Sequence, residues 1–190
     1  MNLSLWLQRS ARACPDRPAL MLGMDVVADY HGFYARAASF AGWLREQGIE
    51  PGARVALLMK NCPEYLIVMF GTWIAGAAVV PINSKLHPKE VAVIIEDSGA
   101  VLTCVTPGMD TGVPGDATLD VQSPAFHAAC QGPQAPVESV GPEGLAWLFY
   151  TSGTTGKPKG VMLTHGMLTS MALCFGVDVD ELCWILGDAA

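Results

Sequence analysis

The chain has 190 residues, of which 51% are apolar, so it can bury the core of one domain or slightly more. Its formal net charge of -7 argues against nucleic acid or an anionic membrane surface as a partner. Its 6 cysteines are scattered, without a C-x-x-C pair or metal-ligand spacing. That pattern predicts free thiols in a reducing compartment, and with them a cytoplasmic protein.

The first third of the chain is predicted to alternate helices with apolar strands. An amphipathic helix is expected over residues 2–13, which lack the apolar core and the cleavage site of a signal peptide. Asn61 is placed to cap a helix that begins near Pro63. The other elements predicted here are a strand at 19–24, a helix at 32–47 and a strand at 54–59.

Residues 65–82 carry no charge and are long enough to be considered as a membrane span. Gly71, Gly76 and Pro81 lie inside this segment, and no aromatic or basic girdle flanks it. We therefore expect a buried helix to about residue 75, a turn and a strand at 77–82, and no transmembrane segment.

The following segments continue the alternation. Ser123 is placed to cap a short helix that ends near Cys130, and residues 131–144 form a connection rich in proline and glycine. Strands that alternate with helices in this way predict an α/β fold with a parallel sheet. The other elements predicted here are a helix at 88–97 and strands at 101–105 and 119–121.

One polar stretch lies between two apolar segments near the C-terminus. Residues 145–150 are predicted to form a buried strand, 161–165 a second buried segment and 166–175 a helix. The stretch between them holds three glycines, four hydroxyl residues and two lysines. Glycines let backbone N–H groups turn toward an anion, hydroxyls can reach a phosphate-bound magnesium ion, and lysines supply positive charge. The composition predicts a phosphate-binding loop.

Three other interpretations fit this stretch less well. A flexible Gly/Ser/Thr linker would not be flanked by strongly apolar segments or stiffened by Pro158. A Walker-type loop requires glycine at position 151, where the chain has threonine, and Ser or Thr after Lys157, where it has proline. A dinucleotide fingerprint requires Gly-x-Gly-x-x-Gly, which the sequence does not contain.

Single polar residues outside the loop are predicted to be structural or solvated. Glu96 and Asp97 are expected at a solvated helix end. His165 is expected to have a structural position at the start of the helix after the loop, and the other three histidines are expected at the surface.

Residues 150–161, continued by 163–165, closely resemble the glycine-rich signature of the adenylate-forming enzymes. These are the acyl-CoA synthetases, aryl-CoA ligases, luciferases and peptide-synthetase adenylation domains. Segments 48–59, 61–83 and 96–100 are also similar, in order and spacing, to the first subdomain of this family. The resemblance implies an α/β fold made of layered parallel-sheet subdomains, as a truncated N-terminal domain.

The resemblance also implies a division of the chain. Residues 1–143 would form the first α/β subdomain of the AMP-binding domain, ending in the Pro/Gly-rich connection at 131–143. Residues 144–190 would begin the next subdomain and carry the loop at 150–161. The family's adenine, ribose and acyl pockets lie after position 190, so fatty, aromatic and small acids all remain open.

In this family the signature loop holds the β- and γ-phosphates of ATP while a carboxylate attacks the α-phosphate. The resemblance assigns the Mg²⁺ carried by ATP to Thr151, and it assigns no catalytic residue to this chain. Lys157 occupies a position that varies in the motif and is a weaker candidate. The residues that match the phosphate-binding positions are Thr151, Ser152, Gly153, Thr154, Thr155, Gly156 and Lys159.

Two functional hypotheses follow. In the first, the chain is the N-terminal piece of an ATP-dependent carboxylate–CoA ligase, which uses ATP, coenzyme A and a carboxylic acid; the piece alone would be inactive. In the second, it is a non-catalytic nucleotide-phosphate-binding or interaction domain, and a peptide-synthetase-type adenylation domain is a further alternative. The intact loop favours the first. Uncovered apolar surface on the isolated chain predicts self-association.

Overall fold

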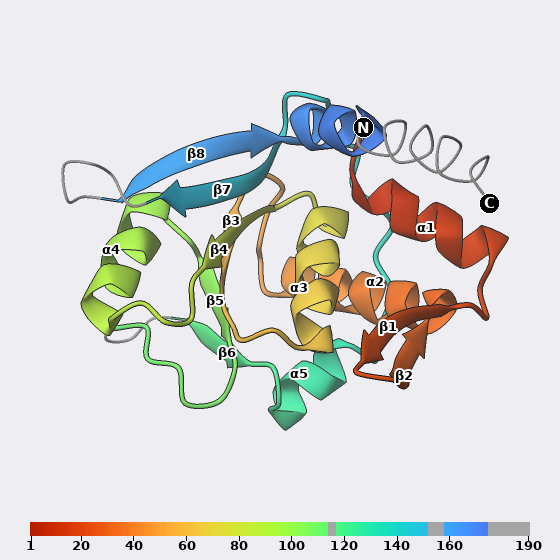
Figure 1. The fold of residues 1–190 in the computed structure, drawn as a ribbon, viewed down its shortest axis with the longest axis horizontal. Helices are drawn as coiled ribbons and strands as arrows, with labels where there is room; N and C mark the ends of the chain where they lie inside the picture. The colour runs from red at the N-terminus through yellow and green to blue at the C-terminus, as the bar shows by residue number, and fades with distance from the viewer. Residues whose placement is uncertain (114–116, 152–157, 175–190) are drawn as a thin grey trace, which may run out of the picture.

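A computed structural model of the chain describes residues 1–113, 117–151 and 158–174, and its centre is a 6-stranded sheet (Figure 1). The strands lie in the order β6-β5-β3-β4-β7-β8. Neighbouring strands are parallel except β7 and β8, which form an antiparallel hairpin at one edge. The predicted α/β fold with a mostly parallel sheet is confirmed. The strands are β3 Arg54–Leu58, β4 Ala78–Ile82, β5 Leu102–Val105, β6 Thr118–Asp120, β7 Leu145–Thr151 and β8 Lys159–Thr164.

Helices cover both faces of this sheet (Figure 1). α1, α2, α3 and α5 pack on one face, around a core that includes Phe40, Leu44 and Phe126. α4 packs on the other face, over a second core that includes Ala56 and Val80. β3 and β4 are therefore buried on both sides, which explains their continuously apolar sequences. The helices are α1 Ser4–Ala13, α2 Tyr30–Glu46, α3 Pro63–Ile74, α4 Pro88–Ser98 and α5 Pro124–Ala129.

The apolar segment at 65–82 is divided between α3 and β4, as predicted. The turn between them contains Gly76, whose φ is 83°. This left-handed conformation favours glycine and ends the helix there. In the part of the chain that the structure describes, no helix is long and apolar enough to cross a membrane.

Side-chain caps mark the starts of α2, α4 and α5 but not those of α1 and α3. Ser123 Oγ accepts the Phe126 N–H at 3.2 Å, which confirms the predicted start of α5. Asn61 does not cap α3: the N-cap is Cys62, without a side-chain capping bond. The prediction for Asn61 is wrong because Pro63 occupies the first turn, where its fixed φ suits the helix and its missing N–H needs no acceptor.

A separate two-stranded sheet precedes α2. It pairs β1 Pro18–Leu22 antiparallel with β2 Asp25–Asp29, across a turn at Gly23 with a φ of 62°. The sequence predicted one strand in this region, and β2 was not among the predicted elements. Most of β2 is exposed, so its short apolar run lacks the alternation that marks a half-buried strand.

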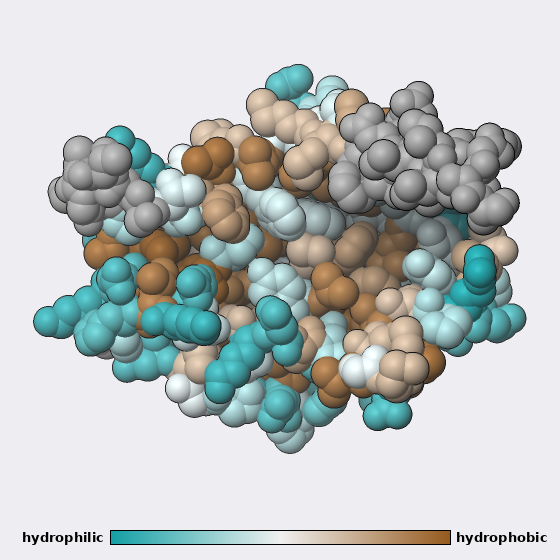
Figure 2. Space-filling view, viewed as in Figure 1, coloured by the Kyte–Doolittle hydropathy of each residue, from teal (hydrophilic) through white to brown (hydrophobic). Residues whose placement is uncertain are grey.

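The two strands that flank the glycine-rich loop are less buried than predicted. In β7 only Ala146 is fully buried, and in β8 the residues from Lys159 to Met162 are all exposed. The expectation of two buried flanks is wrong because β8 is the edge strand of the sheet. Figure 2 shows apolar colour along the upper edge of the molecule, where Figure 1 places β7 and β8. Self-association through such surface stays a prediction.

The Pro/Gly-rich connection between α5 and β7 is held against α2. The Ala135 N–H donates to Ala38 O at 2.9 Å, and Arg45 Nη2 lies 2.9 Å from Glu138 Oε2. β7 then joins β4 in the same sheet. The division of the chain into two subdomains at residue 143 stays a prediction.

The N-terminus is joined to the segment that follows β8. The Leu3 N–H donates to His165 Nδ1 at 3.2 Å, and Asn2 Nδ2 donates to Trp73 O at 2.6 Å. His165 is fully buried and begins the helix formed by residues 165–174. It therefore has the structural position that the sequence indicated.

Candidate functional site

The β7–β8 hairpin presents both ends of the predicted phosphate-binding loop at the carboxyl edge of the parallel strands. In its register, Thr151 at the end of β7 lies opposite Lys159 at the start of β8. Both residues are exposed. The structure thus brings these two predicted residues together. The other predicted loop residues lie outside the described residues: Ser152, Gly153, Thr154, Thr155, Gly156 and Lys157.

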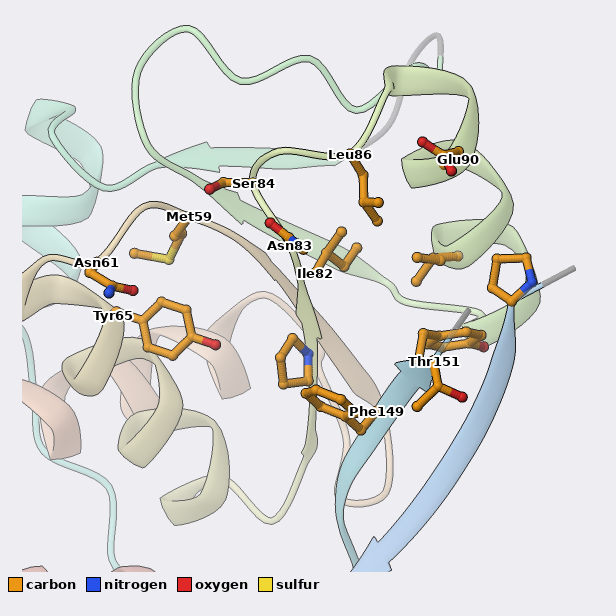
Figure 3. Close-up of a pocket in the computed structure, with 14 residues that line it drawn as sticks. Met59, Asn61, Tyr65, Ile82, Asn83, Ser84, Leu86, Glu90, Phe149 and Thr151 are labelled. Atoms are coloured by element: carbon orange, nitrogen blue, oxygen red, sulfur yellow. The ribbon is translucent and has the colours of Figure 1, made fainter. Parts of the chain in front are cut away.

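A cavity of about 520 Å³ opens beside Thr151, at the carboxyl ends of β3, β4 and β7 (Figure 3). The chain leaves β3 for α3 on one face of the sheet and leaves β4 for α4 on the opposite face. Ligands of open α/β sheets bind in the crevice where connections diverge in this way. The polar residues that line the cavity are Asn61, Tyr65, Asn83, Ser84, Glu90, Tyr150 and Thr151.

The lining combines polar groups, among them the carboxylate of Glu90, with aromatic surface. Figure 3 shows Tyr65 pointing into the cavity from α3, with Phe149 and Thr151 on the opposite wall. Burial raises the pKa of the Tyr65 hydroxyl, so it stays protonated and can donate a hydrogen bond at neutral pH. Glu90 Oε2 accepts the His87 N–H at 3.0 Å and so completes the capping box of α4. The cavity is suited to a ligand with hydrogen-bonding groups and an unsaturated or apolar part.

This cavity was not predicted from the sequence, although part of its signal was present. Asn61 and Asn83 each follow an apolar strand, and the carboxyl ends of parallel strands meet at one edge of a sheet. Nothing local in the sequence places Phe149 in the same cavity as Tyr65, because that arrangement depends on β7 joining β4.

A magnesium ion that arrives with a nucleotide needs oxygen ligands near the phosphates. Thr151 is exposed and lines the cavity, a position that fits the hydroxyl ligand predicted for it. Within residues 1–113, 117–151 and 158–174, no group of three or more His, Cys, Asp or Glu could hold a metal.

A side-chain hydrogen bond joins the hairpin to α4 next to the cavity. Tyr150 Oη donates to Asp97 Oδ2 at 2.5 Å. Burial and this bond to a carboxylate raise the pKa of Tyr150. Asp97 is exposed near the end of its helix, as predicted, but it is also a hydrogen-bond acceptor for the strand that leads into the loop.

Known proteins resemble the chain over most of its length. The family described as AMP-binding enzyme matches residues 7–187. Feruloyl-CoA synthase of an Amycolatopsis species is 38% identical over 88% of this chain and 34% of that protein. The 2-succinylbenzoate–CoA ligase of Bacillus cereus is 30% identical over 95% of this chain and 37% of that protein. Nonribosomal peptide synthetase NPS2 of Ceriporiopsis subvermispora is 35% identical over 78% of this chain and 6% of that protein.

Solved structures agree with these relatives. The o-succinylbenzoate CoA synthetase of Bacillus subtilis superposes with a TM-score of 0.80 at 26% identity, over 91% of this chain and 36% of that one. The fatty acyl CoA synthetase of Mycobacterium tuberculosis gives 0.72 at 28% identity, over 86% and 34%. The chain spans about a third of the length of the CoA ligases that it matches. With one family matched over residues 7–187, the chain belongs to the AMP-binding, adenylate-forming enzymes.

Proposed function

We propose that this chain supplies the ATP-phosphate loop of an AMP-forming carboxylate–CoA ligase. The observation that carries the proposal is the facing pair of Thr151 and Lys159 beside a cavity at the carboxyl edge of the sheet. Two CoA ligases among the relatives, at 38% and 30% identity, support this class of reaction.

The proposed reaction has two steps. A carboxylate oxygen attacks the α-phosphorus of ATP, the bond to the bridging oxygen of the β-phosphate breaks, and pyrophosphate leaves with the electron pair. The sulfur of coenzyme A then attacks the acyl carbon of the adenylate, AMP leaves, and the thiol proton passes to solvent. Negative charge grows on the departing pyrophosphate in the first step, so positive charge and hydrogen-bond donors placed there lower the barrier.

Each loop residue has a role in this proposal. The Lys159 ammonium would neutralise charge on the β- and γ-phosphates, in a chain whose net charge of -7 otherwise repels them. The Thr151 hydroxyl would ligate the Mg²⁺ that accompanies ATP, which supplies further neutralisation when bound. The residues at 152–157 would donate backbone and hydroxyl hydrogen bonds.

Pyrophosphate exchange tests the proposal on the complete protein. Lys159→Ala should slow ATP–pyrophosphate exchange about 100-fold, the lower end of the range found when one transition-state donor is removed. Thr151→Ala should slow exchange less, about tenfold, in the range found when a group that supports a metal ion is removed. Lys89→Ala and Thr118→Ala remove the same groups at exposed positions away from the cavity lining and should leave exchange unchanged. Unchanged exchange in both loop variants would refute the phosphate-binding role.

The carboxylic acid is proposed only as a class. Aromatic acids come first in a screen, because feruloyl-CoA synthase is the relative with 38% identity. Fatty and small acids follow, and acid-dependent exchange above the background without acid identifies a substrate.

A peptide-synthetase-type adenylation domain is a second candidate, favoured by the 35% identity to NPS2. Both candidates form an acyl-adenylate, and they differ in the thiol that accepts the acyl group. Acyl transfer to free coenzyme A supports the ligase. Transfer only to a phosphopantetheinyl carrier protein supports the second candidate, and ATP binding without exchange for any acid supports a non-catalytic nucleotide binder.

A further inference from the structure

The loop end of the β7–β8 hairpin extends past the point where β7 is anchored to the sheet. The parallel register joins Val79 of β4 to Trp147 of β7, four positions before Thr151. From there the hairpin register continues as far as the pair Thr151–Lys159. A two-stranded ribbon is marginally stable by itself and twists readily. The position of the loop therefore depends on what holds this ribbon from the side.

Tyr150 and Asp97 form such a lateral contact. Tyr150 Oη donates to Asp97 Oδ2 at 2.5 Å, between residues 53 positions apart. The Tyr150 ring packs against the second core, which α4 also covers. Asp97 lies in the last turn of α4, and Figure 1 shows this helix next to the loop end of the hairpin. The bond thus joins a packed ring to a helix, one residue before Thr151.

The end of α4 is itself fixed to the sheet. Arg54 of β3 donates through Nε to the carbonyl of Ser98, the residue after Asp97. Ser98 is buried, and its Oγ donates to Ile95 O at 3.1 Å. A continuous set of contacts therefore runs from the central strand β3 through the end of α4 to the hairpin.

Gly160 makes room for the Tyr150 ring. The two residues are opposite each other in the hairpin register. A Cβ at position 160 would lie 3.3 Å from Tyr150 Cζ and 3.0 Å from Leu148 Cδ1, closer than ordinary van der Waals contact. This glycine of the signature therefore lets the tyrosine ring lie across β8 toward α4.

We propose that Asp97 and Tyr150 are positioning residues that brace the phosphate loop for ATP. The inference rests on the proposed function, because it concerns the same loop. Neither positioning role requires contact with ATP: Tyr150, which also lines the cavity, acts through its neighbour Thr151, and Asp97 acts through Tyr150. Without the brace the ribbon end moves, so MgATP and pyrophosphate bind more weakly, whereas binding of the acid is unaffected.

Kinetics of the complete protein separate positioning from a purely structural role. Tyr150→Phe and Asp97→Ala should each raise the KM for MgATP about fivefold, the size expected for one partly solvated hydrogen bond to a charged group, with the KM for the acid unchanged. The double variant should be no worse than either single one, because both remove the same bond. Tyr30→Phe in α2 and Glu96→Ala at the exposed neighbour of Asp97 are matched controls that leave the Tyr150–Asp97 bond intact, and both should behave like the wild type.

Limited trypsin digestion gives a readout that does not require activity. Cleavage of the Lys159–Gly160 bond, followed by mass spectrometry, should be about fivefold faster in Tyr150→Phe and Asp97→Ala, because the ribbon opens more often. Controls and wild type should be cut at the same rate. The bond after Lys157 is not a trypsin site, because Pro158 follows it.

Three outcomes would overturn the inference: unchanged KM for MgATP with unchanged cleavage, a lowered melting temperature with unchanged KM, or additive effects in the double variant. These are distinguishable from failure of the proposed function. If Thr151→Ala and Lys159→Ala impair exchange while the two brace variants do not raise the KM for MgATP, the brace is refuted and the phosphate loop stands. If the two loop variants leave exchange unchanged, the proposed function fails first.

Discussion

The buried imidazole of His165 should make the stability of this fold fall at mildly acidic pH. His165 has no exposed surface, and its Nδ1 accepts the Leu3 N–H at 3.2 Å. An accepting Nδ1 carries no proton, so the ring is neutral and protonated at Nε2. Among the described residues, Nε2 has no hydrogen-bond partner. Burial, and then the nearby N-terminal ammonium, lower the pKa of His165 from 6.5 to about 4.

The direction of the effect follows from which state binds the proton. Between pH 6.5 and 4 the unfolded chain is protonated at His165 and the folded chain is not. The contribution of His165 to stability is therefore full above pH 6.5 and is lost as the pH falls through about 4. At roughly 1.4 kcal/mol for each pKa unit, the difference between 6.5 and about 4 corresponds to about 3 kcal/mol of unfolding free energy.

Denaturant unfolding of the wild type and of His165→Asn at pH 7.5, 6.5, 5.5 and 4.5 tests this prediction. Asparagine does not titrate, and its Oδ1 can replace Nδ1 as the acceptor for Leu3. At pH 7.5 the variant should be about 2 kcal/mol less stable, because the smaller side chain leaves a cavity beside Trp73. Carboxylates titrate in both proteins, so the difference between them isolates the histidine. This difference should shrink steadily below pH 6.5 and change sign at about pH 5, because the total loss in the wild type exceeds the initial difference. Parallel curves over the whole range would refute the reasoning.

Two further predictions concern packing and thiol chemistry. Gly71→Ala places a Cβ 2.8 Å from Ala37 O and should lower the free energy of unfolding, measured by calorimetry, by about 2 kcal/mol. Gly141→Ala places its Cβ in open space and should change this free energy by less than about 0.5 kcal/mol. Equal effects of the two substitutions would contradict the packing of α2 on α3. Cys104 is buried, which raises the pKa of its thiol, whereas Cys174 is exposed. Alkylation of the native protein should therefore label Cys174 first and Cys104 only on unfolding. Equal labelling rates of the two thiols, measured by mass spectrometry, would contradict the burial of β5.

Elements with a strong local signal could be predicted from the sequence. β3 is a short, continuous apolar run, and α5 follows a capping serine, Ser123. The helix and strand inside 65–82 were separable because glycine and proline interrupt the run. The errors arose where a local sequence rule did not decide the structure. The N-cap of α3 is Cys62 and not Asn61, and the exposed strand β2 has no apolar–polar alternation by which it could be predicted.

The candidate site was only partly predictable, for the same reason. The loop between Thr151 and Lys159 is marked by its composition, which needs no knowledge of the fold. The cavity and the Tyr150–Asp97 bond join segments that are far apart in the sequence, and no local pattern encodes them. The exposure of β8 likewise depends on its place at the edge of the sheet and not on its apolar sequence.

The edge position of β8 also explains why contacts from distant segments gather at its two ends. A central strand is fixed by neighbours on both sides, whereas β8 has β7 on one side only in the sheet that the structure describes. At the C-terminal end of β8, His165 accepts a hydrogen bond from the backbone N–H of Leu3. At the N-terminal end of β8, Gly160 lies against the Tyr150 ring, whose hydroxyl reaches Asp97 of α4. The first contact is remote from the loop and should govern stability. The second adjoins Thr151 and should govern the affinity for MgATP. Substitutions at the two ends of one short strand should therefore change different measured quantities, and the structure gives the reason: only one end leads into the loop.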